Sequence, residues 1–511
     1  MLTLNGRAPY RRPAAEAAHR APLYAPPVIL AIDQGTSSTT CMVFDERGAV
    51  AGRAAQELEQ HFPRPGWVEH DAGEIWEGTL ATARAALADA GVEASALSGI
   101  GITNQRETVV AWDRRTGEPL GRAIVWQDRR TAARCDELRE AGYEDLVRER
   151  TGLVLDPYFS GTKMEWLVRE GIAGVGAALG TIDSWLAFKL TGRHATDYSN
   201  ASRTLLFDIG ELRWDEELCD LFGVPVDALP EPLPSGAVYG DTRELGGSVP
   251  VAALAGDQQA ALYGQTCHEE GLGKNTYGTG SFLLQNTGQG RPPVAEGLVT
   301  TIAWGVADRV YYALEASIFV TGAAVQWLRD GLGVIAAVDE TEGLARSLDS
   351  NDGVYFVPAL TGLGSPHWDA YARGTIVGLT RGSTRAHLAR ATLESIAYQS
   401  VDAARAVETA SGTELSDLRA DGGATVNGWL MQFQADLLGV PVVVPAIPET
   451  TALGAAYLAG VATGLWSEAD TRAMWSEGAR YEPRMPADER ETLIADWRRA
   501  VDRARGWDRA S

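Results

Sequence analysis

Cysteine is scarce in this chain. The 511 residues include four, Cys41, Cys135, Cys219 and Cys267, and none stands in a C-x-x-C or other metal-binding spacing. This excludes a disulfide-stapled scaffold and a zinc module with the usual ligand spacing. The pattern is typical of structural thiols in a reducing compartment, so we expect a cytoplasmic protein.

Long hydrophobic runs are also missing. No apolar stretch approaches the roughly 18 residues of a membrane helix, so we expect no membrane span. Residues 1–26 carry several arginines and prolines without an apolar core, which argues against a signal peptide. We interpret them as a disordered extension or as the product of a start codon placed too early. A targeting role is the less favoured alternative.

Positive charge is in deficit. Lys and Arg number 45 against 68 Asp and Glu, which gives a net charge of -23. A nucleic-acid binder needs a basic face, so we expect no nucleic-acid partner. The sequence has no G-x-x-x-x-G-K-[ST] phosphate loop and no G-x-G-x-x-G that opens a helix. Any nucleotide site must therefore be built in another way.

What the chain does have is an ordinary globular composition, 45% hydrophobic and 22% charged, over a length too great for one core. Apolar strands and helical patterns alternate, which predicts an α/β protein with two large domains. A region rich in Pro and Gly, 225–250, indicates a loop-rich approach to the domain boundary. The expected strands are Val28–Ile32, Cys41–Asp45, Ala49–Ala55, Ser98–Asn104, Thr108–Trp112, Val251–Ala255 and Leu418–Ala420, and the expected helices are Asp128–Glu140, Ala316–Asp330, Ala386–Glu408 and Gly428–Leu438.

Two predicted hairpins share one design. The first carries Asp33, Gly35 and five hydroxyl residues, Thr36 to Thr40, in its turn, and the second carries Tyr277-Gly278-Thr279-Gly280-Ser281. Glycine and hydroxyl groups can surround phosphate oxygens, and a nearby Asp can hold hydrated Mg²⁺. A polar turn without function is the alternative for either hairpin alone. The pair favours phosphate binding, and it suggests two related domains that face each other.

Charged and aromatic side chains follow several of the strands. Arg106 and Glu107 come after a predicted strand end, where they could bind polyol hydroxyls or form an ordinary surface ion pair. Trp126 and Tyr158 could wall a substrate or pack in the core. Asp257 lies at the predicted start of a helix. It could be the general base of a phosphoryl transfer, or it could only cap the helix N-terminus. Asp421-Gly422-Gly423, followed by Asn427, permits close approach of a flat ligand or is a simple strand-to-helix turn.

Together these residues resemble the FGGY carbohydrate kinase family from about Val28 to Trp466. The motifs that carry the resemblance include IDQGTSST, GITNQRET, AIVWQDRRT, TDYSNASRT, AGDQQAAL, KNTYGTGSF and DGGATVN, in the family's order. YFSGTKMEWLVRE and GTIVGLTRGSTRAHLARATLE match its two general signatures. NQRET together with GDQQAA points to the glycerol-phosphorylating branch, because xylulose kinases usually carry other residues at both places.

The resemblance implies two actin-like, ribonuclease-H-like domains around a central cleft, 27–262 for glycerol and phosphate and 263–511 for the nucleotide. It implies transfer of a phosphoryl group from ATP, with Mg²⁺, to glycerol, giving sn-glycerol 3-phosphate, with Asp257 as general base. Relatives are often dimers or tetramers. The implied glycerol contacts are Arg106, Glu107, Trp126, Tyr158, Asp257, Gln258 and Phe282; the implied ATP contacts are Thr36, Ser37, Ser38, Thr279, Gly322, Gln326, Gly423 and Asn427; the implied metal ligands are Asp33 and Asp257.

The chain departs from the family's pattern in three places. Thr40 stands where many relatives have an arginine that reaches the nucleotide phosphates, so we expect weaker ATP binding or a substitute cation. The segment 240–249 does not match the loop that binds fructose 1,6-bisphosphate in some relatives, and we expect no inhibition by that sugar. No histidine lies between His194 and His268, so we expect no activation by histidine phosphorylation there.

Three alternatives remain open at this point. The first is a kinase of the same family for another polyol or ketose, such as erythritol or xylulose. The second is a catalytically silent actin-like binding protein, against which Asp257 and both phosphate turns argue. The third is an actin-like ATPase or chaperone, which would not need Arg106, Glu107 and an aromatic wall.

Overall fold

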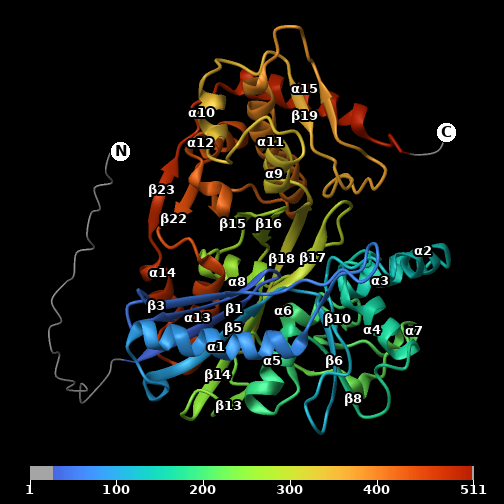
Figure 1. Cartoon of the computed structure of the whole chain (residues 1–511), viewed down its shortest axis with the longest axis vertical. Coiled ribbons are helices and arrows are strands. Elements are labelled where there is room, and N and C mark those ends of the chain that lie inside the picture. The colour runs from blue at the N-terminus through green and yellow to red at the C-terminus, as the bar shows by residue number, and fades with distance from the viewer. Residues whose placement is uncertain (1–26, 509–511) are drawn as a thin grey trace, which may run out of the picture.

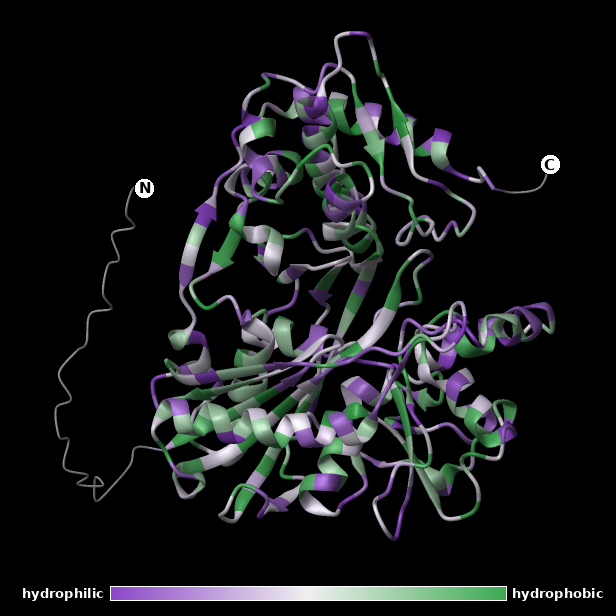
Figure 2. Ribbon diagram, viewed as in Figure 1, coloured by the Kyte–Doolittle hydropathy of each residue, from purple (hydrophilic) through white to green (hydrophobic). Residues whose placement is uncertain are grey.

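The computed structural model describes residues 27–508, so the interpretation of residues 1–26 lies outside the described part of the chain. Two large mixed sheets, each flanked by helices, stack along the long axis of the molecule (Figure 1). This confirms the predicted α/β class and its two-domain fold. Figure 2 shows hydrophobic residues along the central strands of both sheets, whereas hydrophilic residues are frequent in the outer helices and loops and on the edge strand β23.

The first sheet has the strand order β13-β14-β5-β1-β2-β3. β1 pairs antiparallel with β2 and parallel with β5, and β5 pairs parallel with β14. Both β1 and β5 are buried on both faces, and the first five residues of β1, VILAI, form the continuous apolar run expected of such a strand. The strands span β1 Val28–Gln34, β2 Ser38–Phe44, β3 Val50–Glu57, β5 Leu97–Asn104, β13 Gly240–Thr242 and β14 Val249–Gly256.

The second sheet repeats the topology of the first. Its order is β17-β18-β16-β15-β21-β22-β23, and the run β18-β16-β15-β21-β22 has the pairing directions of β3-β2-β1-β5-β14. The shared order supports the hypothesis of two related domains. The strands span β15 Gly273–Tyr277, β16 Ser281–Asn286, β17 Val299–Val306, β18 Arg309–Ile318, β21 Leu418–Asp421, β22 Val442–Pro445 and β23 Glu477–Tyr481.

Two helices cross between the sheets. α8 (Asp257–Gly264) leaves the first sheet at β14 and packs near β15 and β16, while α13 (Thr450–Thr463) follows β22 and packs on β1, β5 and β14 of the first sheet. Glycines allow this close crossing: a Cβ on Gly264 would collide with the Thr450 carbonyl, and one on Gly454 with the Ala260 carbonyl. The two halves therefore share one continuous apolar interface.

The remaining elements surround the two sheets. A smaller sheet, β4-β7-β6-β8, lies beside the first one, and a two-stranded β19-β20 ribbon lies in the second half. Within residues 27–508, no helix is both long and apolar enough to cross a membrane. The remaining bounds are β4 Glu69–His70, β6 Val109–Asp113, β7 Ala123–Ile124, β8 Ala177–Thr181, β9 Ala195–Asp197, β10 Phe207–Asp208, β11 Arg213–Trp214, β12 Glu231–Leu233, β19 Tyr355–Val357, β20 Thr375–Val377, α1 Ala72–Ala90, α2 Ala132–Glu140, α3 Glu144–Thr151, α4 Ser160–Arg169, α5 Ile182–Thr191, α6 Tyr198–Ala201, α7 Glu216–Leu221, α9 Gly322–Asp330, α10 Glu340–Arg346, α11 Arg385–Ser411, α12 Gly428–Leu438, α14 Glu468–Met474 and α15 Ala487–Ala504.

Three sequence predictions of elements need correction. The helix expected over Ala316–Asp330 is wrong before Gly322, because β18 runs to Ile318 and α9 begins at Gly322. The helix expected from Asp128 begins at Ala132, since the Asp128 carboxylate bonds the turn before it. Ser38 to Thr40 lie in strand β2, so the first turn is shorter than expected.

Candidate active site

Arg106 lies at the centre of a buried polar group. It follows β5, and its guanidinium donates to Glu315 through Nη1 at 2.6 Å and Nη2 at 3.2 Å. Its Nε lies 3.2 Å from Asp257 Oδ1. Arg106 is 2% exposed, so the interpretation as a surface ion pair is wrong. An arginine this deep must be neutralised by its neighbours, and it takes carboxylates from both halves of the chain.

Glu107 faces the same polar group because the chain turns sharply after β5. Its φ of +62 is left-handed, a conformation that non-glycine residues seldom adopt. The strand ends at Asn104, so Arg106 and Glu107 need not point to opposite faces. Glu107 is buried, and its carboxylate accepts from Arg203 Nε at 2.7 Å. Arg106 and Glu107 can therefore face one ligand.

Asp257 is the first residue of α8 and keeps 31% of its side chain exposed. The capping position belongs to Gly256, so the N-cap interpretation of Asp257 is wrong. A Cβ on Gly256 would lie 2.8 Å from Cγ and Cδ of Arg106, which explains a glycine there. Burial raises the pKa of the Asp257 carboxyl, while Arg106 and Lys274 oppose the rise. The exposed fraction leaves the carboxylate accessible, and the raised pKa makes it a better proton acceptor than an ordinary Asp.

Asp33 and Asp257 carry carboxylates that repel each other. Asp33 lies near the end of β1, and burial together with the charge of Asp257 raises its pKa to about 7. A cation between two such carboxylates would offset their repulsion, and carboxylate oxygens are ligands that Mg²⁺ prefers. The donor set therefore fits Mg²⁺. Thr40 is the cross-strand partner of Asp33 on β2.

Aromatic rings line the polar group. The rings of Trp126 and Tyr158 meet edge to face at 5.6 Å, and Trp126 Nε1 donates to Thr36 Oγ1 at 2.9 Å. The Tyr158 hydroxyl accepts from Arg106 Nη2 at 3.2 Å. Phe282, on β16, lies under the Arg106 guanidinium at 5.5 Å. Thr36, a predicted phosphate contact, and the predicted glycerol contacts Trp126, Tyr158 and Phe282 thus lie around the same polar group.

Lys274, on β15, completes the charge balance. Its ammonium donates to Gln258 Oε1 and, at 2.7 Å, to Thr276 Oγ1. Burial lowers the pKa of Lys274 to about 8, against the attraction of Asp421 and Asp257. Gln258 is thus held by a cation that sequence reasoning did not select.

The other predicted ATP residues lie on the second half and on the first turn. Gly322 N–H donates to the Gly278 carbonyl at 3.0 Å, which joins α9 to the second turn beside Thr279. A Cβ on Gly322 would lie 2.6 Å from that carbonyl oxygen. The Asn427 side chain caps α12 by accepting from Leu430 N–H at 3.0 Å. Ser37, Thr279, Gln326 and Gly423 are exposed, and Ser38 is half-buried at the start of β2.

Sequence reasoning missed Arg203 and Glu315 as well as Lys274. Arg203 donates to Glu315 Oε1 at 2.9 Å and to Glu107, and both new residues are fully buried. A signal existed for Glu315, since it is the single charged residue inside the apolar run YYALEASIF. Such acids are almost never fully buried unless paired. The pairing of Glu315 with Arg203 could not be predicted, because the two residues are 112 positions apart in the sequence.

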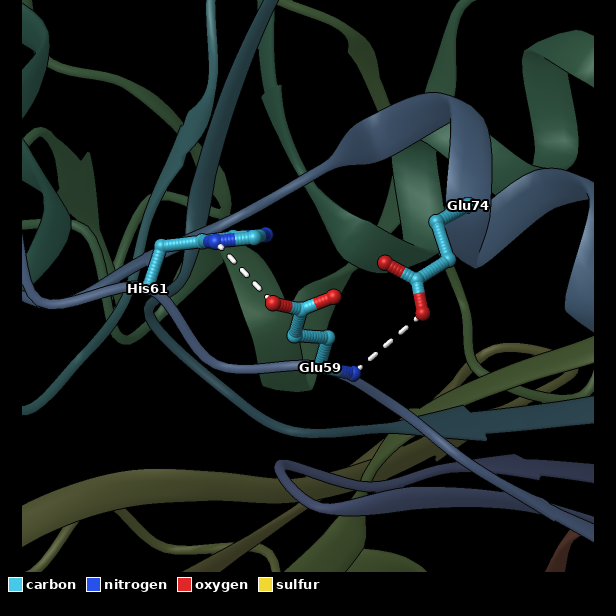
Figure 3. Close-up of side chains that lie close together, drawn as sticks. All are labelled: Glu59, His61 and Glu74. Atoms are coloured by element: carbon cyan, nitrogen blue, oxygen red, sulfur yellow. Dashed lines mark hydrogen bonds and ion pairs between the residues drawn. The ribbon is translucent and has the colours of Figure 1, made fainter.

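A second acidic group lies elsewhere. Glu59, His61 and Glu74 gather near the start of α1, with ligand atoms within 4.8 Å of one another (Figure 3). The Glu59 N–H donates to Glu74 Oε1 at 3.2 Å, and His61 Nδ1 lies 3.7 Å from Glu59 Oε1. Exposed acids often gather in this way without an ion, so these three residues alone do not define a metal centre.

Comparison with known proteins assigns the chain to a family. The N-terminal domain of the FGGY family of carbohydrate kinases matches residues 28–264, and its C-terminal domain matches residues 273–463. Glycerol kinase 2 of Thermotoga maritima is 54% identical over 94% of this chain and 99% of its own, and a glycerol kinase of Dechloromonas aromatica is 56% identical over 94% and 98%.

A solved structure gives the same result. The glycerol kinase of Plasmodium falciparum with ADP superposes with a TM-score of 0.87 at 36% identity, over 93% of this chain and 98% of that one. A gluconate kinase of Lactobacillus acidophilus, at 21% identity and a TM-score of 0.83, shares the fold over 94% of this chain and 97% of its own. The chain belongs to the FGGY family of carbohydrate kinases.

Proposed function

We propose that this enzyme transfers the γ-phosphoryl group of ATP to glycerol and releases sn-glycerol 3-phosphate and ADP. The observation that carries the proposal is the position of Asp257: an accessible carboxylate 3.2 Å from Arg106, whose guanidinium also contacts Glu107, Tyr158 and the ring of Phe282. Relatives that share more than half of their residues with this chain are glycerol kinases.

Each hydroxyl of a polyol both donates and accepts a hydrogen bond. Arg106 carries N–H donors, which bond Glu315, Gln259 and Tyr158 and face Asp257, so a hydroxyl of glycerol binds by sharing or replacing one of these partners. Glu107 carries acceptor oxygens, and the aromatic rings cover C–H groups. Asp257 takes the proton of the attacking hydroxyl late, because the transition state of phosphoryl transfer is loose. An acceptor that lacks one hydroxyl forms fewer of these bonds, which gives selectivity.

The phosphates of ATP bind between the two turns, at Thr36, Ser37 and Ser38 on one side and Thr279 on the other. Gly322, Gln326, Gly423 and Asn427 hold the rest of the nucleotide. Asp33 and Asp257 would hold Mg²⁺, which supplies positive charge against the phosphates when it is bound. The domains divide as 27–262 and 263–511, and their closure excludes water from the transfer. The four cysteines are buried free thiols, which agrees with a cytoplasmic enzyme.

The direct test is identification of the product. The purified full chain is incubated with glycerol and Mg-ATP, and the product is offered to an sn-glycerol 3-phosphate-specific dehydrogenase. Stoichiometric oxidation, equal to the ADP released, is the expected result. ADP release without oxidisable product would contradict the proposal.

A further inference from the structure

We propose that Glu315 and Arg203 are positioning residues for acceptor binding: they fix the orientation of Arg106 and Glu107 without touching the substrate. The inference rests on the proposed function, because it treats Arg106 and Glu107 as the groups that bind glycerol. It adds two residues that lie behind the site and that come from different parts of the fold.

Glu315 lies between two guanidinium groups. Its Oε2 accepts from Arg106 Nη1 at 2.6 Å, and its Oε1 accepts from Arg106 Nη2 at 3.2 Å and from Arg203 Nη2 at 2.9 Å. Glu315 and Arg203 have no exposed side-chain surface, whereas Arg106 and Glu107 each keep 2% and Asp257 keeps 31%, so Glu315 and Arg203 lie behind the groups that face the site. Burial alone would raise the pKa of Glu315, yet the two arginines hold it down, at about 2. The carboxylate is a fixed anion.

Arg203 connects this anion to the other substrate group. Its Nε donates to Glu107 Oε1 at 2.7 Å while its Nη2 donates to Glu315. Positive and negative side chains therefore alternate in one row of contacts, in the order Arg106, Glu315, Arg203 and Glu107, and all four are buried. Because a guanidinium is a rigid planar fork, two bonds to one carboxylate set the direction of its plane. The orientations of Arg106 and Glu107, the two residues proposed to bind glycerol, are then set by Glu315 and Arg203.

The arrangement spans the two halves of the protein. Arg106 follows β5 of the first sheet, Arg203 follows α6, and Glu315 lies on β18 of the second sheet. Neighbouring bonds fix the same junction: Gln259 accepts from Arg106 Nη1 at 3.3 Å and donates to Thr301, on β17, at 3.0 Å. The acceptor pocket is therefore held by a strand of the half that is proposed to bind the nucleotide.

Loss of the Glu315 charge has a defined consequence. The Nη groups of Arg106 face Glu315, Gln259 and Tyr158, and its Nε faces Asp257. Without Glu315, the fork of Arg106 can turn to pair fully with Asp257. That contact would displace the guanidinium of Arg106 and engage the carboxylate of Asp257, the proposed base. Misplacement of a reacting group by about 1 Å can cost on the order of 100-fold in rate.

The test compares two buried glutamates. Glu315→Gln keeps the shape and removes the charge; Glu394→Gln does the same for a glutamate that is 2% exposed and pairs with Arg390 at 2.7 Å away from the site. We expect kcat/KM for glycerol to fall at least roughly tenfold in Glu315→Gln, with KM for ATP within about twofold of wild type. Glu315→Asp should recover part of the loss. Glu394→Gln should keep the wild-type kcat/KM for glycerol.

A double-variant cycle tests whether Glu315 acts through Arg106. In the Arg106→Ala background, Glu315→Gln should cost less than about threefold further, because the group that it positions is already gone. Should Glu315→Gln fail to fold, Arg203→Lys keeps the charge, removes the fork, and is expected to show the same selective loss for glycerol.

The inference is overturned if Glu315→Gln, or Arg203→Lys in its place, keeps kcat/KM for glycerol within about twofold. It is equally overturned if both glutamate variants lose activity in parallel with thermal stability, or if losses multiply fully in the double variant. Failure of the proposed function is separate, since wild-type protein would then show no glycerol-dependent ADP release.

Discussion

At the scale of the residue, the proposed chemistry depends on how charge is balanced around Asp257. Arg106 lies 3.2 Å from it, but that guanidinium is also held by Glu315. A base that formed an exclusive ion pair would be a poor proton acceptor. Because Arg106 is shared with Glu315 and Glu107, Asp257 is held in position yet stays available, and burial raises its pKa against the opposing charges of Arg106 and Lys274.

Asp257→Asn tests the role of this carboxylate. The amide keeps the shape and cannot accept the hydroxyl proton, so kcat should fall by roughly 10² to 10⁴ or more, whereas glycerol binding measured by calorimetry should persist. Asp241→Asn, at an exposed position on β13, is the matched control and should be active. Near-normal turnover in Asp257→Asn would remove it as the base.

Lys274 predicts a pH dependence. Its pKa is lowered to about 8, so the ammonium loses its charge as the pH rises through 8, although a free lysine would keep it. We expect kcat/KM to decline above pH 8, because the positive charge beside Gln258 and the carboxylates is lost. The measurement is a pH-rate profile from about 6.5 to about 9.5, which brackets that pKa.

Lys274→Arg serves as the comparison, because an arginine stays protonated throughout this range. The variant should lack the decline above pH 8, whatever its absolute activity. A flat wild-type profile, or an identical decline in Lys274→Arg, would show that another group titrates.

At the scale of the element, the crossing of α8 and α13 holds the two sheets together. Gly454→Ala should destabilise the protein, since the new Cβ meets the Ala260 carbonyl on backbone that cannot move aside. Overpacking of this kind costs about 1–3 kcal/mol or more, and thermal unfolding measures it.

Gly343→Ala is the control for this prediction, because Gly343 lies in helix α10 and a Cβ added there would have nothing within 4 Å. It should be neutral or stabilise by up to about 1 kcal/mol. Equal unfolding temperatures for Gly454→Ala and Gly343→Ala would contradict the expected clash.

Elements in which apolar residues recur with a clear helical period were predictable from the sequence. Helix α12 has the predicted bounds, Gly428–Leu438, and α11 lies within three residues of its prediction. The helix expected from Ala316 failed because β18 is buried on both faces, so its apolar run carries no alternation that would separate strand from helix. The pattern of a single strand or helix does not show which residues pair across the fold, so Arg203 was missed and the lone charge of Glu315 in its apolar run was left without a partner.

At the scale of the whole molecule, the same strand order appears twice, and the candidate site takes residues from both copies. Arg106, Glu107 and Asp257 follow strands of the first sheet, whereas Glu315, Phe282 and Lys274 lie on strands of the second. The residues that resemblance implied for the acceptor lie together. Their roles, and those of the nucleotide residues, remain predictions.

The most direct test of the central claim compares acceptors. ADP release by the purified full chain is measured with Mg-ATP and, in turn, glycerol, dihydroxyacetone, erythritol, xylitol, xylulose, gluconate and no acceptor. The account predicts the highest kcat/KM by far for glycerol. A higher value for another polyol or ketose, or no release above the acceptor-free rate, would contradict it.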